Sequence, residues 1–185
     1  MKFLFTTPRR GMLLVFTFLL TLPFMANRAM ALQNAENQDV RNLLSLAAQQ
    51  AAALDYDADQ MQGLLRNDVS WQAHATLLSS VKEHVNQLGR TTAKLQAQRG
   101  EASTWQQRGI DRIVPLLREL ADNTTAAINH LNKNQARPVS GGYADYLDDN
   151  ADVAHELSEL ISATSQYGHS RAKLEKLEQR IQPST

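Results

Sequence analysis

The sequence predicts an all-α protein, an antiparallel four-helix bundle with long, coiled-coil-like helices. Apolar residues recur at alternating spacings of three and four along several long stretches, as they do on the buried edge of a coiled-coil helix. Glycine and proline are scarce and cluster at a few places, which divides the chain into stretches of similar length. Four amphipathic columns joined by short turns are typical of this fold.

Ahead of the first helix, residues 1–31 have the pattern of a cleaved export signal. They begin with basic residues, continue with an almost unbroken apolar run and end in a small-x-small triplet that a signal peptidase recognises. In order, these features are Lys2, Arg9 and Arg10, then Met12 to Phe24, then Ala29-Met30-Ala31. The run is too short to span a bilayer comfortably, and no second one follows. We therefore expect an exported protein, periplasmic or secreted, with one mature domain at residues 32–185 and no membrane span. The pair Arg9-Arg10 leaves open whether export follows the general or the twin-arginine route.

The first predicted helix covers residues 35 to 54 and buries Val40, Leu44 and Leu54 on one face. Residues 55–57, Asp-Tyr-Asp, are expected to interrupt it. Asp57 would then cap a short helix from 58 to 66 that carries Met61.

The second predicted helix begins near Asp68, a plausible cap, and runs to about residue 99. Its inward positions follow a regular heptad: Trp71, His74, Leu78, Val81, Val85, Leu88, Thr92 and Leu95. After a tight break at residues 99–101, Ser103 and Gln106 form a capping box that opens a third helix to about residue 134. Pro115 inside this helix cannot donate to the carbonyl of Asp111 and should kink it.

The fourth predicted helix follows a loop at residues 134–142 and runs from about 143 to 182, with Gly168 as an expected weak point. At 1.5 Å per residue it is roughly 60 Å long, whereas the other columns measure roughly 45 Å. Residues 171–182 should therefore extend beyond the bundle. Leu174, Leu177 and Ile181 make this overhang apolar.

Composition excludes several function classes. The chain has no cysteine, so disulfides, thiolate metal sites and c-type haem attachment are excluded. Without residues 1–31 the 19 basic and 19 acidic residues become 15 and 19, which gives no basic footprint for nucleic acid.

Histidines are the only candidates for chemistry at a metal or haem. His155, Glu159 and Asp152 resemble part of a helical di-iron site, but the chain contains no Glu-x-x-His motif. Met61 and the inward His74 are the candidate axial ligands of a b-type haem. A hydrogen-bonded or solvated histidine is the better explanation of each position, so we assign no catalytic, cofactor-binding or metal residue, no cofactor and no enzymatic activity.

Two further polar groups have structural explanations. Thr92, Thr124, Asn150 and Thr164 fall on inward positions, where polar residues fix helix register; a polar ligand cavity would use the same residues. Asp145, Asp148, Asp149 and Asp152 cluster at the start of the fourth helix. There they complement the helix dipole, with weak cation binding as the alternative.

The central part of the chain carries a family resemblance. The segments WQQRGIDRIVPLLRELADNTTAAINHLN, residues 105–132, and SWQAHATLLSSVKEHVNQLG, residues 70–89, resemble small exported helical proteins of acidobacterial-type genomes. That resemblance implies an exported bacterial bundle and carries over no active-site residue.

These observations favour a non-enzymatic protein-interaction or structural component of the bacterial envelope. The expected partner is another protein or a second copy, and the expected contact regions are residues 171–182 and the surroundings of Pro115. The alternative is a carrier of haem, metal or another small ligand in the bundle core.

Overall fold

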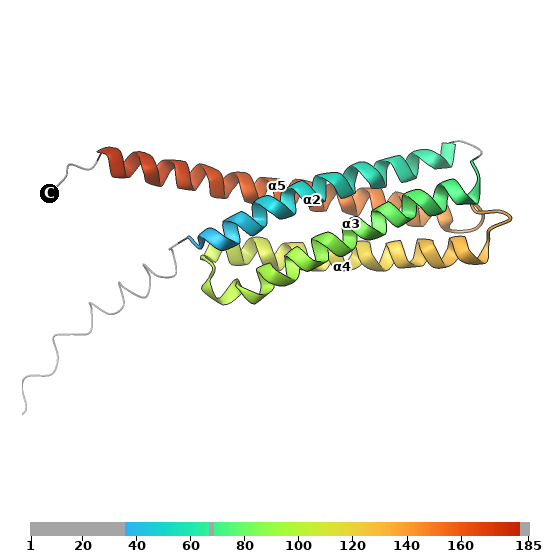
Figure 1. Cartoon of the computed structure of the whole chain (residues 1–185), viewed down its shortest axis with the longest axis horizontal. Helices are drawn as coiled ribbons and strands as arrows, with labels where there is room; N and C mark the ends of the chain where they lie inside the picture. Colours follow the sequence, from blue (N-terminus) through green and yellow to red (C-terminus); the bar gives the residue numbers. More distant parts are fainter. Residues whose placement is uncertain (1–35, 67–68, 182–185) are drawn as a thin grey trace, which may run out of the picture.

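The computed structural model describes residues 36–66 and 69–181, so the predicted export signal at residues 1–31 lies outside the described part. Four long helices account for most of it: α2 (Gln38–Gly63), α3 (Trp71–Ala97), α4 (Thr104–Lys133) and α5 (Tyr143–Ile181). Two short 3-10 turns, η1 (Leu64–Arg66) and η2 (Arg99–Glu101), follow α2 and α3. The described residues contain no strand, and the predicted all-α four-helix fold is confirmed (Figure 1).

The four helices run alternately up and down and close into a bundle. Each packs against the next along the chain, and α2 also packs against α5. In Figure 1 the helices lie nearly parallel to one axis, with α2 and α5 along one side and α3 and α4 along the other. Such packing buries one stripe of every helix and leaves the remainder of its surface to solvent.

One apolar cluster fills the interior along the length of the bundle, and each fully buried leucine or isoleucine contributes about 1.5–3 kcal/mol relative to exposure. Its largest fully buried apolar members are Leu44, Leu54, Met61, Leu78, Leu88, Leu95, Ile110, Ile113, Leu120, Leu147 and Leu157. The heptad predicted for the second helix lies in this core from His74 to Leu95, while Trp71 packs against it only partly buried.

The predicted interruption at residues 55–57 is wrong, because α2 continues without a break to Gly63. Leu54, Ala58 and Met61 extend the same buried stripe through this region, and their packing outweighs the weak helix propensity of aspartate. Asp57 does not cap a new helix. Its carboxylate instead lies 3.3 Å from the imidazole Nδ1 of His84 on α3.

Helix α3 also begins later than predicted. Ser70, in an extended conformation, is its N-cap and accepts a hydrogen bond from the backbone N–H of Ala73, whereas Asp68, the expected cap, lies outside the described residues. The capping box of Ser103 and Gln106 at the start of α4 is confirmed. Helix α4 runs through Pro115 to Lys133 as one element.

Gly168 is not a weak point of α5. The helix continues past it, and a Cβ at this position would lie 2.8 Å from Cη2 of Trp105 on α4. Gly109 has the same role on α4, since a Cβ there would lie 2.7 Å from Cγ2 of Thr164. These two glycines let α4 and α5 pack closely near the start of α4.

The C-terminal part of α5 extends beyond the other helices, as Figure 1 shows at the end of the bundle where α2 begins. We call residues 171–181 the α5 overhang. Every side chain from Lys173 to Ile181 is exposed. Within the described residues, none of the helices is both long and apolar enough to cross a membrane.

Candidate functional site

The residues proposed for a metal site do not come together. His155 is on the surface of α5, with Nδ1 3.5 Å from Asp55 Oδ2 and Nε2 3.6 Å from Glu159 Oε1. Asp152 is exposed one turn earlier. Across residues 36–66 and 69–181, no three histidine or acidic side chains are placed so that they could hold one metal ion.

The two candidate haem ligands are both buried in the packed core. Met61 belongs to the apolar cluster at the end of α2. His74, which is 0 % exposed, packs its ring edge-to-face against Tyr143, with Nδ1 3.4 Å from the tyrosine hydroxyl. Close packing and a hydrogen-bond partner identify His74 as a structural core residue.

Sequence reasoning missed the aromatic cluster around Tyr143 near the α4–α5 loop. His130 stacks on Tyr143 with ring centroids 5.2 Å apart, and Tyr146 contacts His130 edge-on. Burial lowers the pKa of His74 and raises that of Tyr143, so both of these side chains are uncharged at neutral pH. In the sequence, only the inward heptad position of His74 indicated this aromatic cluster, because its other members come from elements that are distant in the sequence.

The polar residues at the predicted inward positions are only partly hydrogen-bonded. Thr124 donates a 3.3 Å hydrogen bond to Asn150 Oδ1 across the α4–α5 interface, and both side chains are buried as predicted. Thr164 donates to the carbonyl of Leu160 in its own helix. The buried hydroxyl of Thr92 has no hydrogen-bond partner among the described residues.

A buried glutamine ties together the two helix starts at one end of the bundle. The amide oxygen of Gln106 accepts hydrogen bonds from the backbone N–H groups of Ser103 and Asn37, at 2.9 and 3.1 Å. Its Nε2 donates to the carbonyl of Asn37, the N-cap of α2, at 2.8 Å. The capping box predicted half of this arrangement, and the link to α2 is a tertiary contact.

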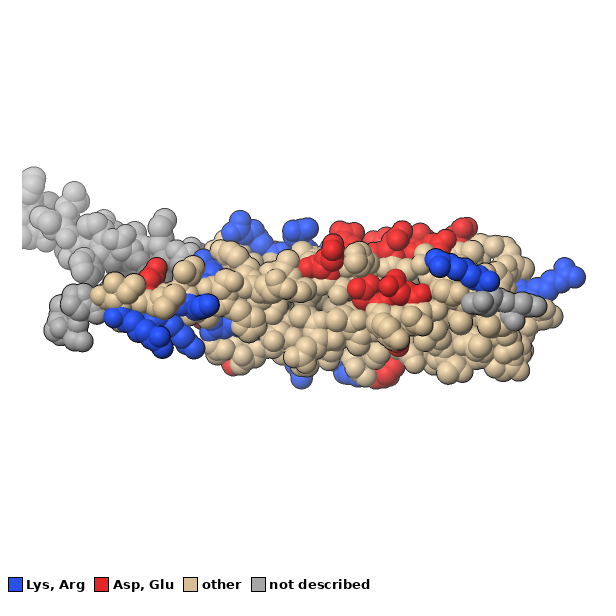
Figure 2. All heavy atoms as spheres, turned by 90° about the horizontal axis from the view of Figure 1, so that it is seen from above, with Lys and Arg blue, Asp and Glu red and all other residues tan. Residues whose placement is uncertain are grey.

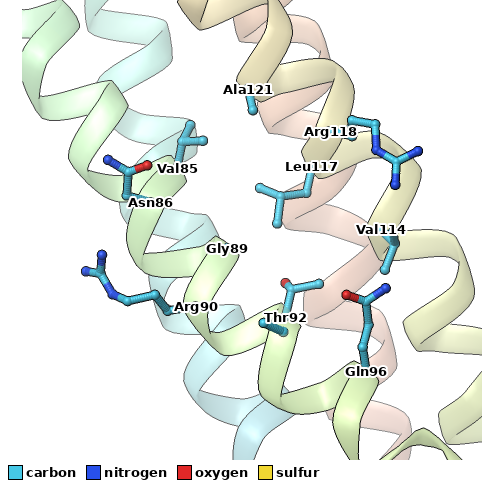
Figure 3. Close-up of a pocket in the computed structure, with 11 residues that line it drawn as sticks. Val85, Asn86, Gly89, Arg90, Thr92, Gln96, Val114, Leu117, Arg118 and Ala121 are labelled. Carbon is cyan, nitrogen blue, oxygen red and sulfur yellow. The ribbon is translucent and has the colours of Figure 1, made fainter.

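Figure 3 shows a groove of about 510 Å³ between α3 and α4. Leu117 and Thr92 point into the gap between the two helices, while Arg90 and Arg118 extend away from it on opposite sides. A smaller groove of about 330 Å³ lies between α4 and α5 beside Trp105 and Tyr167. In neither groove does the lining include a histidine or carboxylate, so neither has a general acid–base pair.

The predicted acidic cluster lies on the exposed surface of α5. Asp145, Asp148, Asp149 and Asp152 are all exposed, and Asp148 accepts a 2.9 Å hydrogen bond from Nε2 of Gln62 on α2. Figure 2 shows acidic side chains gathered over the middle of the face that α2 and α5 form, with basic side chains on either side of them, toward the overhang and at the opposite end.

The α5 overhang has the largest concentration of exposed apolar side chains in the described part of the chain. Leu174, Leu177 and Ile181 are 59 %, 41 % and 79 % exposed, and Tyr167 at its base is half-exposed. By contrast, α4 contributes none of the large exposed apolar side chains of the described residues, although Pro115 itself is exposed. Of the two contact regions expected from sequence, the overhang is the one with large exposed apolar side chains.

Comparison of the chain with protein-family models, with curated proteins and with solved structures finds no match.

Proposed function

We propose that this protein is an exported, non-enzymatic interaction component of the bacterial envelope, and that the α5 overhang is its contact element. The observation that supports this most directly is the exposure of Leu174, Leu177 and Ile181 on a helix that continues beyond its bundle. Adjacent exposed apolar side chains on a helix are typical of a surface that a partner covers.

The remainder of the described chain supports a binding role over a catalytic one. Buried polar groups such as Gln106 and Asn150 join helices to each other. His74 is packed in the core, and His155 is exposed between the carboxylates of Asp55 and Glu159. These contacts stabilise the bundle, and the bundle holds the overhang at one of its ends.

Site-specific photo-crosslinking in an exporting bacterial host tests the proposal. A photoreactive residue at position 177 should give discrete crosslinked products, because a bound partner covers the overhang. The same residue at position 46 is the matched control, since Leu46 is as exposed as Leu177 but belongs to the body of α2. Equal, weak crosslinking at both positions would contradict a contact role for the overhang.

Export has its own test. Sequencing of the mature N-terminus should find Leu32 as the first residue of the extracytoplasmic protein, because Ala29-Met30-Ala31 precedes it. A chain that keeps residues 1–31 in the cytoplasmic fraction would contradict the envelope location.

Haem or metal carriage is the alternative function. It requires His74 or Met61 to leave the core positions in which both are packed. An absorbance spectrum and metal analysis of the exported protein, purified without chelators, measure it directly. A Soret band lost in His74→Ala, or near-stoichiometric metal, would favour this alternative over the interaction proposal.

A further inference from the structure

The apolar side chains of the overhang continue a stripe that is solvent-exposed along most of α5. Its members recur three or four residues apart, or two helical turns apart on either side of Tyr167, and therefore share one face of the helix. The first part of the stripe is acidic and the last part apolar. The acidic residues are Asp145, Asp149, Asp152, Glu156 and Glu159, and the apolar residues are Tyr167, Leu174, Leu177 and Ile181.

We infer that the partner of the overhang is a second copy of this chain, whose own overhang packs against it in antiparallel orientation. This inference rests on the proposed contact role of the overhang. It describes a symmetric, end-to-end dimer in which the two bundles point away from each other, joined by one pair of helices.

The spacing of the apolar residues fits such a pair. Leu174, Leu177 and Ile181 have the three–four spacing of a coiled-coil seam. In an antiparallel pair centred near residues 175–176, Leu174 packs against the partner's Leu177 and Ile181 lies opposite the partner's Ser170. Each overhang then covers the apolar surface of the other.

Charges on one flank of the seam complement each other in this orientation. Arg171 lies against the ring of Tyr167, 5.9 Å from its centroid, and donates a 3.4 Å hydrogen bond to the tyrosine hydroxyl. It forms no ion pair within the described residues. Glu178 is exposed seven residues later on the same helix, and it forms no ion pair with Arg171 or with any other described residue. Antiparallel packing brings Arg171 beside the partner's Glu178, twice per dimer.

The acidic part of the stripe disfavours the parallel alternative. Two α5 helices packed in parallel would bring Asp149, Asp152, Glu156 and their acidic neighbours opposite the same residues of the partner, with no basic side chain on the stripe to offset them. The antiparallel arrangement keeps these acidic surfaces apart, at opposite ends of the dimer.

The other flank limits the affinity. Lys173 and Arg180 lie on the other side of the seam, and both are exposed. In the antiparallel pair, Lys173 of one copy faces Arg180 of the second copy. Repulsion between exposed long side chains is modest because they diverge into solvent. Together with the short helical overlap, it makes the dimer a weak one, of the class of transient contacts that bury less than about 1,200 Å².

Sedimentation equilibrium of the mature chain, residues 32–185, from micromolar to millimolar concentration tests the inference. We expect a monomer–dimer equilibrium. Arg171→Glu and Glu178→Arg should each weaken dimerisation about fivefold, because each converts two attractive contacts to repulsive ones. The double variant, which exchanges the two charges, should restore dimerisation to within about twofold of the wild type.

Lys176→Glu is the matched control. It changes the net charge as much as Arg171→Glu does, but Lys176 lies on the side of the helix opposite the seam, so dimerisation should stay within about twofold of the wild type. Thermal unfolding followed by circular dichroism verifies that every variant is folded.

Three results would overturn the inference: a monomer at every concentration, a dimer insensitive to both single charge reversals, or a double variant no better than the single ones. If the chain is monomeric but position 177 still crosslinks to a different protein, only the identity of the partner is wrong. If position 177 crosslinks to nothing, the contact role proposed for the overhang fails as well.

Discussion

At the scale of single residues, the buried imidazole of His74 gives the bundle a pH-sensitive stability. Burial lowers its pKa below the ordinary value of 6.5, so the unfolded chain binds a proton more readily than the folded one. Stability should therefore be complete above about pH 6.5. It should decrease as the pH falls from there and level off below the lowered pKa.

Urea unfolding at pH 7.5, 6.5 and 5.5 measures this dependence. His74→Gln, which keeps a hydrogen-bonding group beside Tyr143, should unfold with a smaller pH dependence than the wild type. His169→Gln is the matched control, because His169 is exposed on α5 and lies outside the core. An unchanged pH dependence in His74→Gln would show that another group titrates.

Alanine substitutions at two glycines inside the helices should have opposite effects on stability, because the surroundings of the two glycines differ. Gly89 is in the interior of α3 with nothing within 4 Å of an added Cβ, so Gly89→Ala should stabilise the protein by about 0.5–1 kcal/mol through helix propensity. Gly109→Ala should destabilise it by about 1–3 kcal/mol, since the new Cβ overlaps Thr164.

Urea denaturation of both glycine variants at neutral pH gives the comparison. The chemical change is the same in each, so the difference between them isolates packing from propensity. Equal effects of the two substitutions would contradict the close approach of α4 and α5 at Gly109.

At the scale of one element, α4 retains a proline in its interior. Pro115 is exposed and lacks the N–H that would donate to the carbonyl of Asp111. Pro115→Ala restores that hydrogen bond without removing a core contact, so we expect the protein to be stabilised by about 1–3 kcal/mol. The shift of the urea midpoint measures the gain, and a destabilised variant would indicate that the proline fixes a helix direction that the bundle requires.

Element boundaries illustrate where sequence reasoning succeeds. Ser103 and Gln106 predicted the start of α4 because a capping box is a local interaction between residues three apart. The interruption predicted at Asp55-Tyr56-Asp57 failed, because Leu54, Ala58 and Met61 face the core and their tertiary packing holds α2 continuous.

At the scale of the whole molecule, the overhang and the bundle should be energetically separate. The side chains from Lys173 to Ile181 are exposed, so they contribute little to the core. Deleting residues 171–185 should leave the thermal midpoint of a dilute, monomeric sample within about 2 °C, because less than about 0.5 kcal/mol is lost. A decrease of 10 °C or more would show that the overhang belongs to the folding unit.

The sequence by itself determined the helical class, the buried heptad of α3, the caps at Ser103 and Gln106, and an α5 longer than its neighbours, since these depend on local spacing and length. Tertiary structure alone decided the stack of His130 on Tyr143, the link from Gln106 to Asn37, and the approach of Trp105 to Gly168. Each of these contacts joins side chains from different helices. Their distances depend on how the helices are placed against each other, and hydrophobic periodicity predicts which face of a helix is buried but not what that face meets.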